Sequence, residues 1–301
     1  MPRIPVGDGI ESGLQWLVDH VGAFFEAISA ILLFCVNVMY QVLASPPEFV
    51  LIAILALIAA ATVRSIGMVV FTVLAFVLVV GMQLWTETLQ TLAVVTVAAV
   101  ISVLIGVPIG ILAANSSRTS RAVRPILDFM QTLPVFVYLV PAVFFFGIGV
   151  VPGIVATTVF AIPPAVRLTE LGIRQVDSEM VEAAHAFGAR RNQVLREVQL
   201  PLAVPSIMAG VNQVIMLALS MVVVAGLVGA EGLGGIVVNG VTQLNIGVAF
   251  EGGIAVVILA IFLDRVTSVF GTRRQRSPGI PEWIRGLLRR DETPSSEPAP
   301  V

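Results

Sequence analysis

Residues 182–201, EAAHAFGARRNQVLREVQLP, form a charged, helix-forming stretch between two apolar stretches of this chain. The ionised side chains in it are Glu182, Arg190, Arg191, Arg196 and Glu197. Such groups can move protons or bind metals, but the chain has only two histidines, His20 and His185, and no HExxH or GxSxG motif. It contains no lysine, so a phosphate-binding loop of the form GxxxxGK[ST] is excluded. We therefore expect this stretch to bind a partner, and any ATP to be used by another polypeptide.

The stretch is predicted to fold as two short helices joined by a turn. Residues 182–186 favour a helix, Gly188 interrupts it, and residues 192–198 form a second helical run. Pro201 fits the first turn of the apolar helix that follows, because no amide hydrogen is needed there. We therefore expect a helix–turn–helix at the membrane surface, with small alanines after Glu182 that let a partner approach closely.

The rest of the chain has the composition of a membrane protein. Of its 301 residues, 57% are hydrophobic and 12% are charged, with a mean hydropathy of +0.99. In soluble domains about a quarter of the residues are charged, and a spanning helix needs about 20 mainly apolar residues. We therefore predict an all-α polytopic membrane protein with about seven spanning helices, near residues 48–63, 66–84, 88–114, 131–149, 151–171, 203–229 and 249–270.

The positions of the arginines predict which loops face the cytoplasm, because cytoplasmic loops are enriched in basic residues. All seventeen basic residues are arginine, and most lie in four places: at Arg64, at 118–124, at 174–196 and after the last span. The loops that carry none are 85–87, 147–153 and 231–246. This alternation predicts a cytoplasmic C-terminus and, with seven spans, an N-terminus on the outer side.

The region before these spans, residues 1–47, is predicted to be a separate N-terminal segment. Apolar residues within 14–44 recur with a 3.6-residue period, while Glu26, Asn37 and Gln41 lie away from that face. This pattern is typical of an amphipathic helix lying on the outer surface of the membrane. The alternative is an eighth span over the same residues, which would place the N-terminus inside.

The chain after the last span, residues 272–301, is predicted to be an Arg-rich cytoplasmic tail. Within it, PEWIRGLLRR has apolar residues that suit the lipid interface and arginines that suit anionic headgroups, although a short solvated helix is an equal alternative. The polar, proline-rich end, DETPSSEPAPV, is predicted to be disordered.

The charged stretch resembles the EAA loop of permease subunits in bacterial ABC importers. The motif reads EAA, three residues, glycine, nine residues, a hydrophobic residue, any residue, and Leu-Pro. It is matched here by Glu182, Ala183, Ala184, Gly188, Val198, Leu200 and Pro201, with Val198 in place of the usual isoleucine. The resemblance implies that these residues couple a separate ATPase to the spans; an amphipathic loop without a partner is the alternative. We call residues 174–201 the EAA loop.

The resemblance extends, over roughly residues 85–271, to the permease of glycine betaine/proline betaine importers. The segments that carry it begin RPILDFMQTLP at Arg124, FAIPPAVRLTE at Phe160, QLPLAVPSIMAG at Gln199 and GGIAVVILAIF at Gly252. The resemblance implies the transmembrane fold of type I ABC importers, with a permease domain at 48–271 that transports quaternary ammonium osmoprotectants.

The same resemblance implies a set of partners in the bacterial inner membrane. These are an ABC ATPase subunit, an extracytoplasmic substrate-binding protein, a second permease copy and membrane lipid, with no nucleic acid. No catalytic residue, metal or cofactor is expected on this chain, because ATP would be used by the ATPase. Alternatives are an ABC permease for choline, carnitine or proline, an ion-coupled secondary transporter, and an osmotically gated channel. Secondary transporters commonly carry an internal repeat, which this sequence does not show, and a channel leaves residues 182–201 unexplained.

Three smaller features also give predictions. The spacing of Arg124 and Asp128, and of Arg167 and Glu170, predicts two ion pairs within helices. The glycine-rich run at 226–235 is predicted to be a flexible gate or a turn rather than a nucleotide-binding loop. The three consecutive phenylalanines from Phe144 are predicted to pack against lipid rather than line a transport path.

Overall fold

The computed structural model describes residues 6–272, and over these residues every element of regular structure is a helix. The predicted all-α class is therefore confirmed, while the predicted tail lies outside the described residues from Arg273 onward. The helices are α1 (Val6–Ala44), α2 (Glu48–Val63), α3 (Ile66–Gly81), α4 (Trp85–Asn115), α5 (Ser117–Thr132), α6 (Val135–Phe146), α7 (Val150–Arg174), α8 (Ser178–Ala186), α9 (Arg191–Gln193), the π-helix η1 (Val194–Gln199), α10 (Leu200–Ser220), α11 (Val222–Leu227), α12 (Leu233–Thr242) and α13 (Ile246–Thr272).

The described helices revise the predicted count of seven spans. Five helical stretches are long and apolar enough to cross a membrane, and a bent helix pair would make a sixth. The predicted spans at 48–63 and 66–84 are helices of only 16 residues each, so at 1.5 Å per residue they are about 24 Å long and fall short of a bilayer core of about 30 Å. Hydropathy located both helices, with the bounds of the first as predicted and the second ending at Gly81 instead of residue 84.

The predicted span at 131–149 is interrupted by a sharp bend. Helix α5 ends at Thr132, and α6 begins at Val135 with its axis turned by 93°. The cause is local, because Pro134 has no amide hydrogen and forces Leu133 into an extended conformation with ψ of 134°. The pair is therefore a broken span or a re-entrant segment instead of one straight helix.

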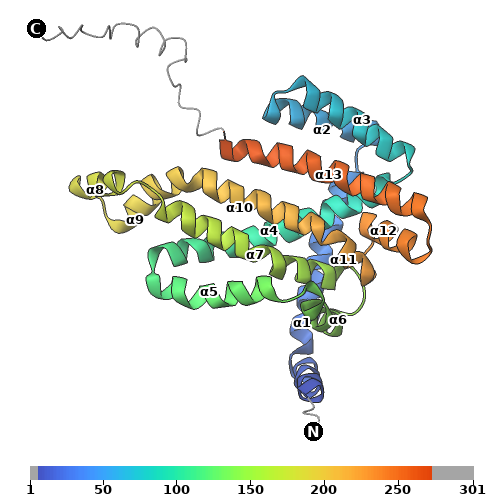
Figure 1. Ribbon diagram of the computed structural model, residues 1–301, viewed down its shortest axis with the longest axis horizontal. Coiled ribbons are helices and arrows are strands. Elements are labelled where there is room, and N and C mark those ends of the chain that lie inside the picture. Colours follow the sequence, from blue (N-terminus) through green and yellow to red (C-terminus); the bar gives the residue numbers. More distant parts are fainter. Residues whose placement is uncertain (1–5, 273–301) are drawn as a thin grey trace, which may run out of the picture.

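Helices α4, α7 and α10 form the centre of the molecule and contact one another through small residues (Figure 1). Gly106 and Gly110 of α4 lie one turn apart, and a Cβ on either would come within 2.6 Å of the Cβ of Ala165 or Thr169 on α7. This is the small-xxx-small packing that brings membrane helices close together. Farther along α7, a Cβ on Gly172 would lie 2.6 Å from the Cβ of Ser206 on α10.

A second part of the core joins α13 to the hairpin of α2 and α3, which lies beside it in Figure 1. Its centre is Phe76 of α3, which is 1% exposed. The ring of Phe76 makes edge-to-face contacts with Trp85 of α4, at 6.3 Å between centroids, and with Phe262 of α13, at 5.4 Å. These contacts attach the short hairpin to the long helices.

Helix α1 runs across the direction of α7, α10 and α13 in Figure 1. Its Leu32 and Val36 pack on Ala93 of α4 and Ile154 of α7, in a cluster that continues along α4 to Val97 and Ala98. By length and hydropathy alone, Ser12–Ala44 also qualifies as a span, so the interfacial position stays a prediction.

The glycine-rich run at 226–235 forms a packed turn at the end of the molecule opposite α8 (Figure 1). Gly229 and Gly232 have positive φ angles of 83° and 103°. A Cβ on Gly226 would lie 2.5 Å from the backbone of Gly234, and the hydroxyl of Thr91 on α4 accepts a hydrogen bond of 2.9 Å from the amide of Leu233. The prediction allowed a flexible gate or a turn, and the run forms a turn. Its packing leaves no space for a side chain at Gly226.

Candidate functional site

The EAA loop begins with a helix, α8, whose start is fixed by its own side chains. Asp177 precedes the helix, and its carboxylate accepts a hydrogen bond of 2.9 Å from the amide of Glu179. This is an N-cap, and the acidic Glu179 in the first turn adds a favourable interaction with the helix dipole. The helix therefore begins at Ser178, four residues before the predicted start, and includes Glu182, Ala183 and Ala184.

The helix ends in the turn that the sequence predicted at Gly188. This glycine has a φ of 81°, in the left-handed region. The amide of Gly188 donates to the carbonyl of His185 at 2.9 Å, and the amide of Ala189 donates to that of Ala184 at 3.1 Å. Together these bonds are the Schellman motif, which favours glycine at this position. The glycine of the EAA motif therefore supplies a backbone conformation that reverses the chain.

The surface that the loop presents is open to solvent. Helix α8 has no buried residue, and it lies at one extreme of the molecule (Figure 1). Beside the turn, Phe187 is 93% exposed, and Met180 on α8 is 52% exposed. Exposed apolar side chains grouped on a small projecting element mark a contact surface. Phe187 is not among the site residues predicted from the sequence, although a large aromatic residue in an otherwise charged stretch was the available signal.

The chain returns toward the membrane through an unbroken helical path. The short helix α9 is followed at once by the π-helix η1, which leads into α10, whereas the sequence predicted a separate second run and a new helix at Pro201. The amide of Leu200 donates to the carbonyl of Leu195, five residues back. Because Pro201 cannot donate and its ring crowds the preceding turn, a widened turn immediately before it keeps the helix continuous. Val198, Leu200 and Pro201 are half-buried there.

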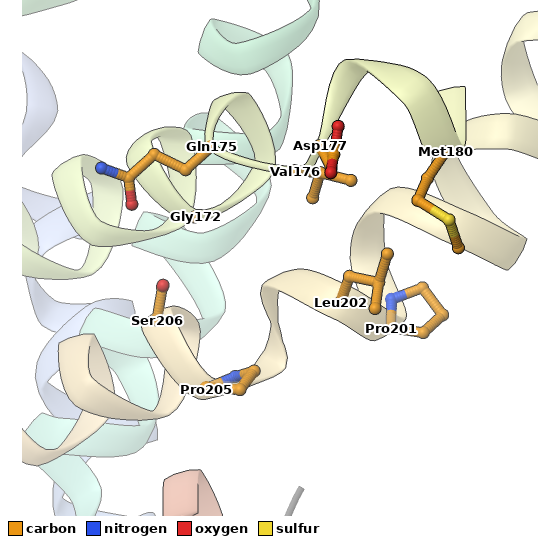
Figure 2. Close-up of a pocket in the computed structure, with 9 residues that line it drawn as sticks. All are labelled: Gly172, Gln175, Val176, Asp177, Met180, Pro201, Leu202, Pro205 and Ser206. Carbon is orange, nitrogen blue, oxygen red and sulfur yellow. The ribbon is translucent and has the colours of Figure 1, made fainter. Parts of the chain in front are cut away.

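A groove of about 470 Å³ lies at the base of the EAA loop, between the end of α7 and the start of α10 (Figure 2). Its walls come from the last turn of α7, the start of α8 and the first turns of α10. Figure 2 shows the side chain of Met180 directed toward Pro201 and Leu202 across this groove. The loop therefore projects beyond the packed helices, and other contacts must fix its position.

Two arginines of the loop, one at its start and one after its turn, supply such contacts. Arg174, the last residue of α7, donates a hydrogen bond of 2.9 Å to the carbonyl of Ala113. Arg191, the first residue of α9, donates to the carbonyl of Asn115. Both carbonyls lie in the last turn of α4, where helix carbonyls have no partner within the helix.

The charged residues between α5 and α7 pair across the two helices, which corrects the predicted pairs within each helix. Arg124 of α5 pairs with Glu170 of α7 at 3.6 Å, and Arg167 of α7 pairs with Asp128 of α5. Glu170 also forms a 3.1 Å ion pair with Arg174. Intrahelical spacing alone does not predict these partners, because arginine side chains are long enough to reach a neighbouring helix.

The remaining candidate residues form no catalytic arrangement among the described residues. Their acids and histidines include no group of three or more that could hold a metal ion. Asp264 of α13 accepts a 2.9 Å hydrogen bond from Asn212 of α10, and Glu231 accepts one of 2.8 Å from Gln90. His185 is exposed on α8.

The predicted packing of the three consecutive phenylalanines is partly corrected. Phe145 stacks on Phe25 of α1 with 4.4 Å between ring centroids, and Phe146 meets the same ring edge-on. These two residues therefore pack against protein, while Phe144 is 41% exposed.

Comparison with known proteins gives close relatives over nearly the whole chain. It is 49% identical to the glycine betaine transport system permease protein OpuAB of Bacillus subtilis, over 89% of this chain and 94% of that protein. It is 45% identical to the glycine betaine/proline betaine permease ProW of Escherichia coli, over 95% of this chain and 82% of that protein. The glycine betaine/carnitine permease GbuB of Listeria monocytogenes is 44% identical, over 91% of this chain and 98% of that protein.

The fold also has a counterpart among solved structures. An inward-facing form of the MetNI methionine ABC transporter superposes with a TM-score of 0.55 and 27% identity, over 60% of this chain and 92% of the matched chain. The predicted fold of the type I ABC importers is therefore confirmed. Residues 106–276 match the family described as the inner membrane component of binding-protein-dependent transport systems, which is more than half of the chain. The chain belongs to this family of transport permeases.

Proposed function

We propose that this chain is the membrane-spanning permease subunit of an ATP-driven importer for glycine betaine and proline betaine-type osmoprotectants. The observation that carries the proposal is the 45–49% identity, over nearly the full length, to two permeases named for glycine betaine transport. The structure adds support, because the first part of the EAA motif forms a projecting helix and turn that a partner can bind.

On this proposal, the EAA loop is the point at which a separate ATPase acts on the permease. Helix α8 enters a cleft on the ATPase, with Phe187 as the apolar anchor and the small Ala183 and Ala184 allowing close approach. Aromatic side chains near the centre of a contact commonly carry much of its binding energy. Two permease copies, each carrying one ATPase, would then be moved together when the ATPases close on ATP.

The positions of the arginines support an orientation with the EAA loop and the C-terminus in the cytoplasm. Arg118 and Arg121 lie at the start of α5, directly after the end of α4 that Arg174 and Arg191 contact. A cluster of basic residues at one end of a helical bundle is characteristic of the cytoplasmic side. The end formed by α11 and α12 would then face the substrate-binding protein.

A second candidate cargo is carnitine, which the name of the Listeria relative includes beside glycine betaine. Both molecules carry a trimethylammonium group and a carboxylate. Aromatic faces usually hold such cations, yet only 7% of this chain is aromatic and the stacked Phe145 faces α1. We infer that the binding protein makes the fine choice between these cargoes.

Transport by purified components tests this proposal. The permease is reconstituted in liposomes with its ATPase, ATP is enclosed on the ATPase side, and the binding protein is added with labelled glycine betaine. Uptake that requires ATP and binding protein is the expected result, and unlabelled carnitine as a competitor measures the second candidate. Equal uptake without nucleotide would instead identify a channel or an ion-coupled carrier.

A further inference from the structure

The first residue of the EAA loop and the segment after its turn are both attached to the same place, the C-terminal turn of α4. Arg174 stands immediately before the loop's first turn and binds the carbonyl of Ala113. Arg191 follows the loop's reversal and binds the carbonyl of Asn115. Cations at the C-terminus of a helix are favoured both by its free carbonyls and by its dipole. The Arg191 contact joins two segments that are far apart in the sequence, because Arg191 is 76 residues from Asn115.

The guanidinium of Arg174 is held in place by a buried carboxylate. Glu170, one turn earlier on α7, is 7% exposed. Its Oε1 atom accepts a hydrogen bond of 2.7 Å from the hydroxyl of Ser120 and lies 3.1 Å from Nε of Arg174. Arg174 thus uses Nε for Glu170 and a terminal nitrogen for Ala113. Only the forked donor group of arginine makes both contacts in this geometry.

Helix α4 is suited to pass on the movement that it receives from the loop. It is packed on α7 through Gly106 and Gly110, so closely that a Cβ on either glycine would lie 2.6 Å from a side-chain atom of α7. A displacement of the loop that reaches the end of α4 therefore moves α4 and α7 as one body. A loop held only by its covalent connections to α7 and α10 could instead move without displacing α4.

We propose that Glu170, Arg174 and Arg191 form a clamp that fixes the EAA loop to α4 and so transmits the movement of the ATPase into the bundle. This inference rests on the proposed function, because it concerns the step between ATP hydrolysis and transport. The three are positioning residues: they touch neither the cargo nor ATP, and they determine how far the spans move for each turnover.

The chain offers a matched control for the clamp. The ion pair of Arg167 and Asp128 joins α5 to α7, as Arg124 and Glu170 do. Its side chains are 45% and 65% exposed, and neither is hydrogen-bonded to α4. Exposed pairs of this kind contribute little to stability. Removing this pair therefore tests for a general effect of losing a charge near the loop.

The experiment measures cargo moved per ATP hydrolysed in liposomes that contain the full permease–ATPase complex. We compare the wild type with Glu170→Gln, Arg174→Lys, Arg191→Ala and the control Arg167→Ala. Coupling energies are typically worth 5–150-fold, so we expect the ratio to fall by about tenfold in the three clamp variants, with the Tm of Arg191→Ala near that of the wild type. The control should keep the wild-type ratio.

Arg191→Ala protects the test against misfolding, because Arg191 is exposed and its loss leaves no buried charge. Wild-type coupling in Arg191→Ala and Arg174→Lys would overturn the clamp, as would an equal loss in Arg167→Ala. Both outcomes leave the proposed function intact, since wild-type uptake would still require ATP. Uptake by the wild type that does not require ATP would overturn both the clamp and the proposed function. A different cargo would change neither the comparison between variants nor the test for ATP dependence.

Discussion

Gly110 on α4 lies so close to Thr169 on α7 that a Cβ added to the glycine would be 2.6 Å from the Cβ of the threonine. Gly106, one turn earlier, is in the same situation against Ala165. At these two glycines the backbone of α4 therefore lies directly against side chains of α7, and we call this contact the seam. Since α7 leads directly into the EAA loop, this seam connects the loop to the centre of the permease.

Replacement of Gly110 by leucine should open this seam. Overpacking of a close contact costs about 1–3 kcal/mol, and here two helices must separate to admit the side chain. We expect a lower Tm of the detergent-purified permease and less protein in the membrane. Gly253→Leu on α13 is the matched control, because a Cβ there meets nothing within 4 Å. Equal Tm values for the two variants would contradict the packing described.

Replacement of Gly188 by valine should damage the turn of the EAA loop without any clash. A Cβ at this position meets nothing within 4 Å, but the φ of 81° costs an L-residue about 1–2 kcal/mol, and a β-branched one more. Asparagine tolerates this conformation, so Gly188→Asn is the control. We expect uptake to fall in the valine variant and to persist in the asparagine variant. Similar uptake in both would mean that the turn is unimportant.

Replacement of Phe187 by alanine should weaken binding of the ATPase and leave the permease itself unchanged. This side chain is 93% exposed, so the fold loses little when it is removed. A central aromatic anchor is typically worth about 2 kcal/mol or more in binding, which corresponds to at least a tenfold rise in Kd. Phe49→Ala is the control: it removes a phenylalanine that is 68% exposed on α2, a helix that lies away from α8 in Figure 1. Unchanged ATPase affinity in Phe187→Ala would exclude Phe187 as the anchor.

Replacement of Asp177 by alanine should loosen the start of α8. Its carboxylate accepts the amide of Glu179 at 2.9 Å, and loss of such a cap costs about 1 kcal/mol. We expect faster amide hydrogen exchange in residues 178–181 and reduced uptake. Asparagine caps equally well, so Asp177→Asn should retain both properties. Identical exchange in the alanine variant and wild type would rule out a capping role.

The sequence predicted the parts of the loop that are governed by neighbouring residues. The turn at Gly188 follows from the intrinsic preference of glycine for positive φ, and the helix before it follows from residues 182–186. The earlier start of α8 was also accessible, because an aspartate followed by Ser178 and Glu179 is a helix N-terminal signal. The bend at Pro134 had a local signal as well, which hydropathy averaging concealed.

Contacts between distant segments could not be predicted in this way. Arg124 and Asp128 have the spacing of an ion pair on one helix, yet each bonds to a residue of α7. The choice of partner depends on which helices are adjacent and on how closely glycines let them approach. The contact of Arg191 with Asn115 likewise depends on the path of the whole loop, which no local pattern specifies.

The most direct test of the account is uptake of labelled glycine betaine in cells that lack other betaine carriers. The chain is expressed with its ATPase and binding protein, with the ATPase omitted, and with Gly188→Val or Gly188→Asn in place of the wild type. The account predicts accumulation that requires the ATPase, is lost in the valine variant and persists in the asparagine variant. Accumulation that continues without the ATPase would contradict the assignment of residues 182–201 as the coupling element.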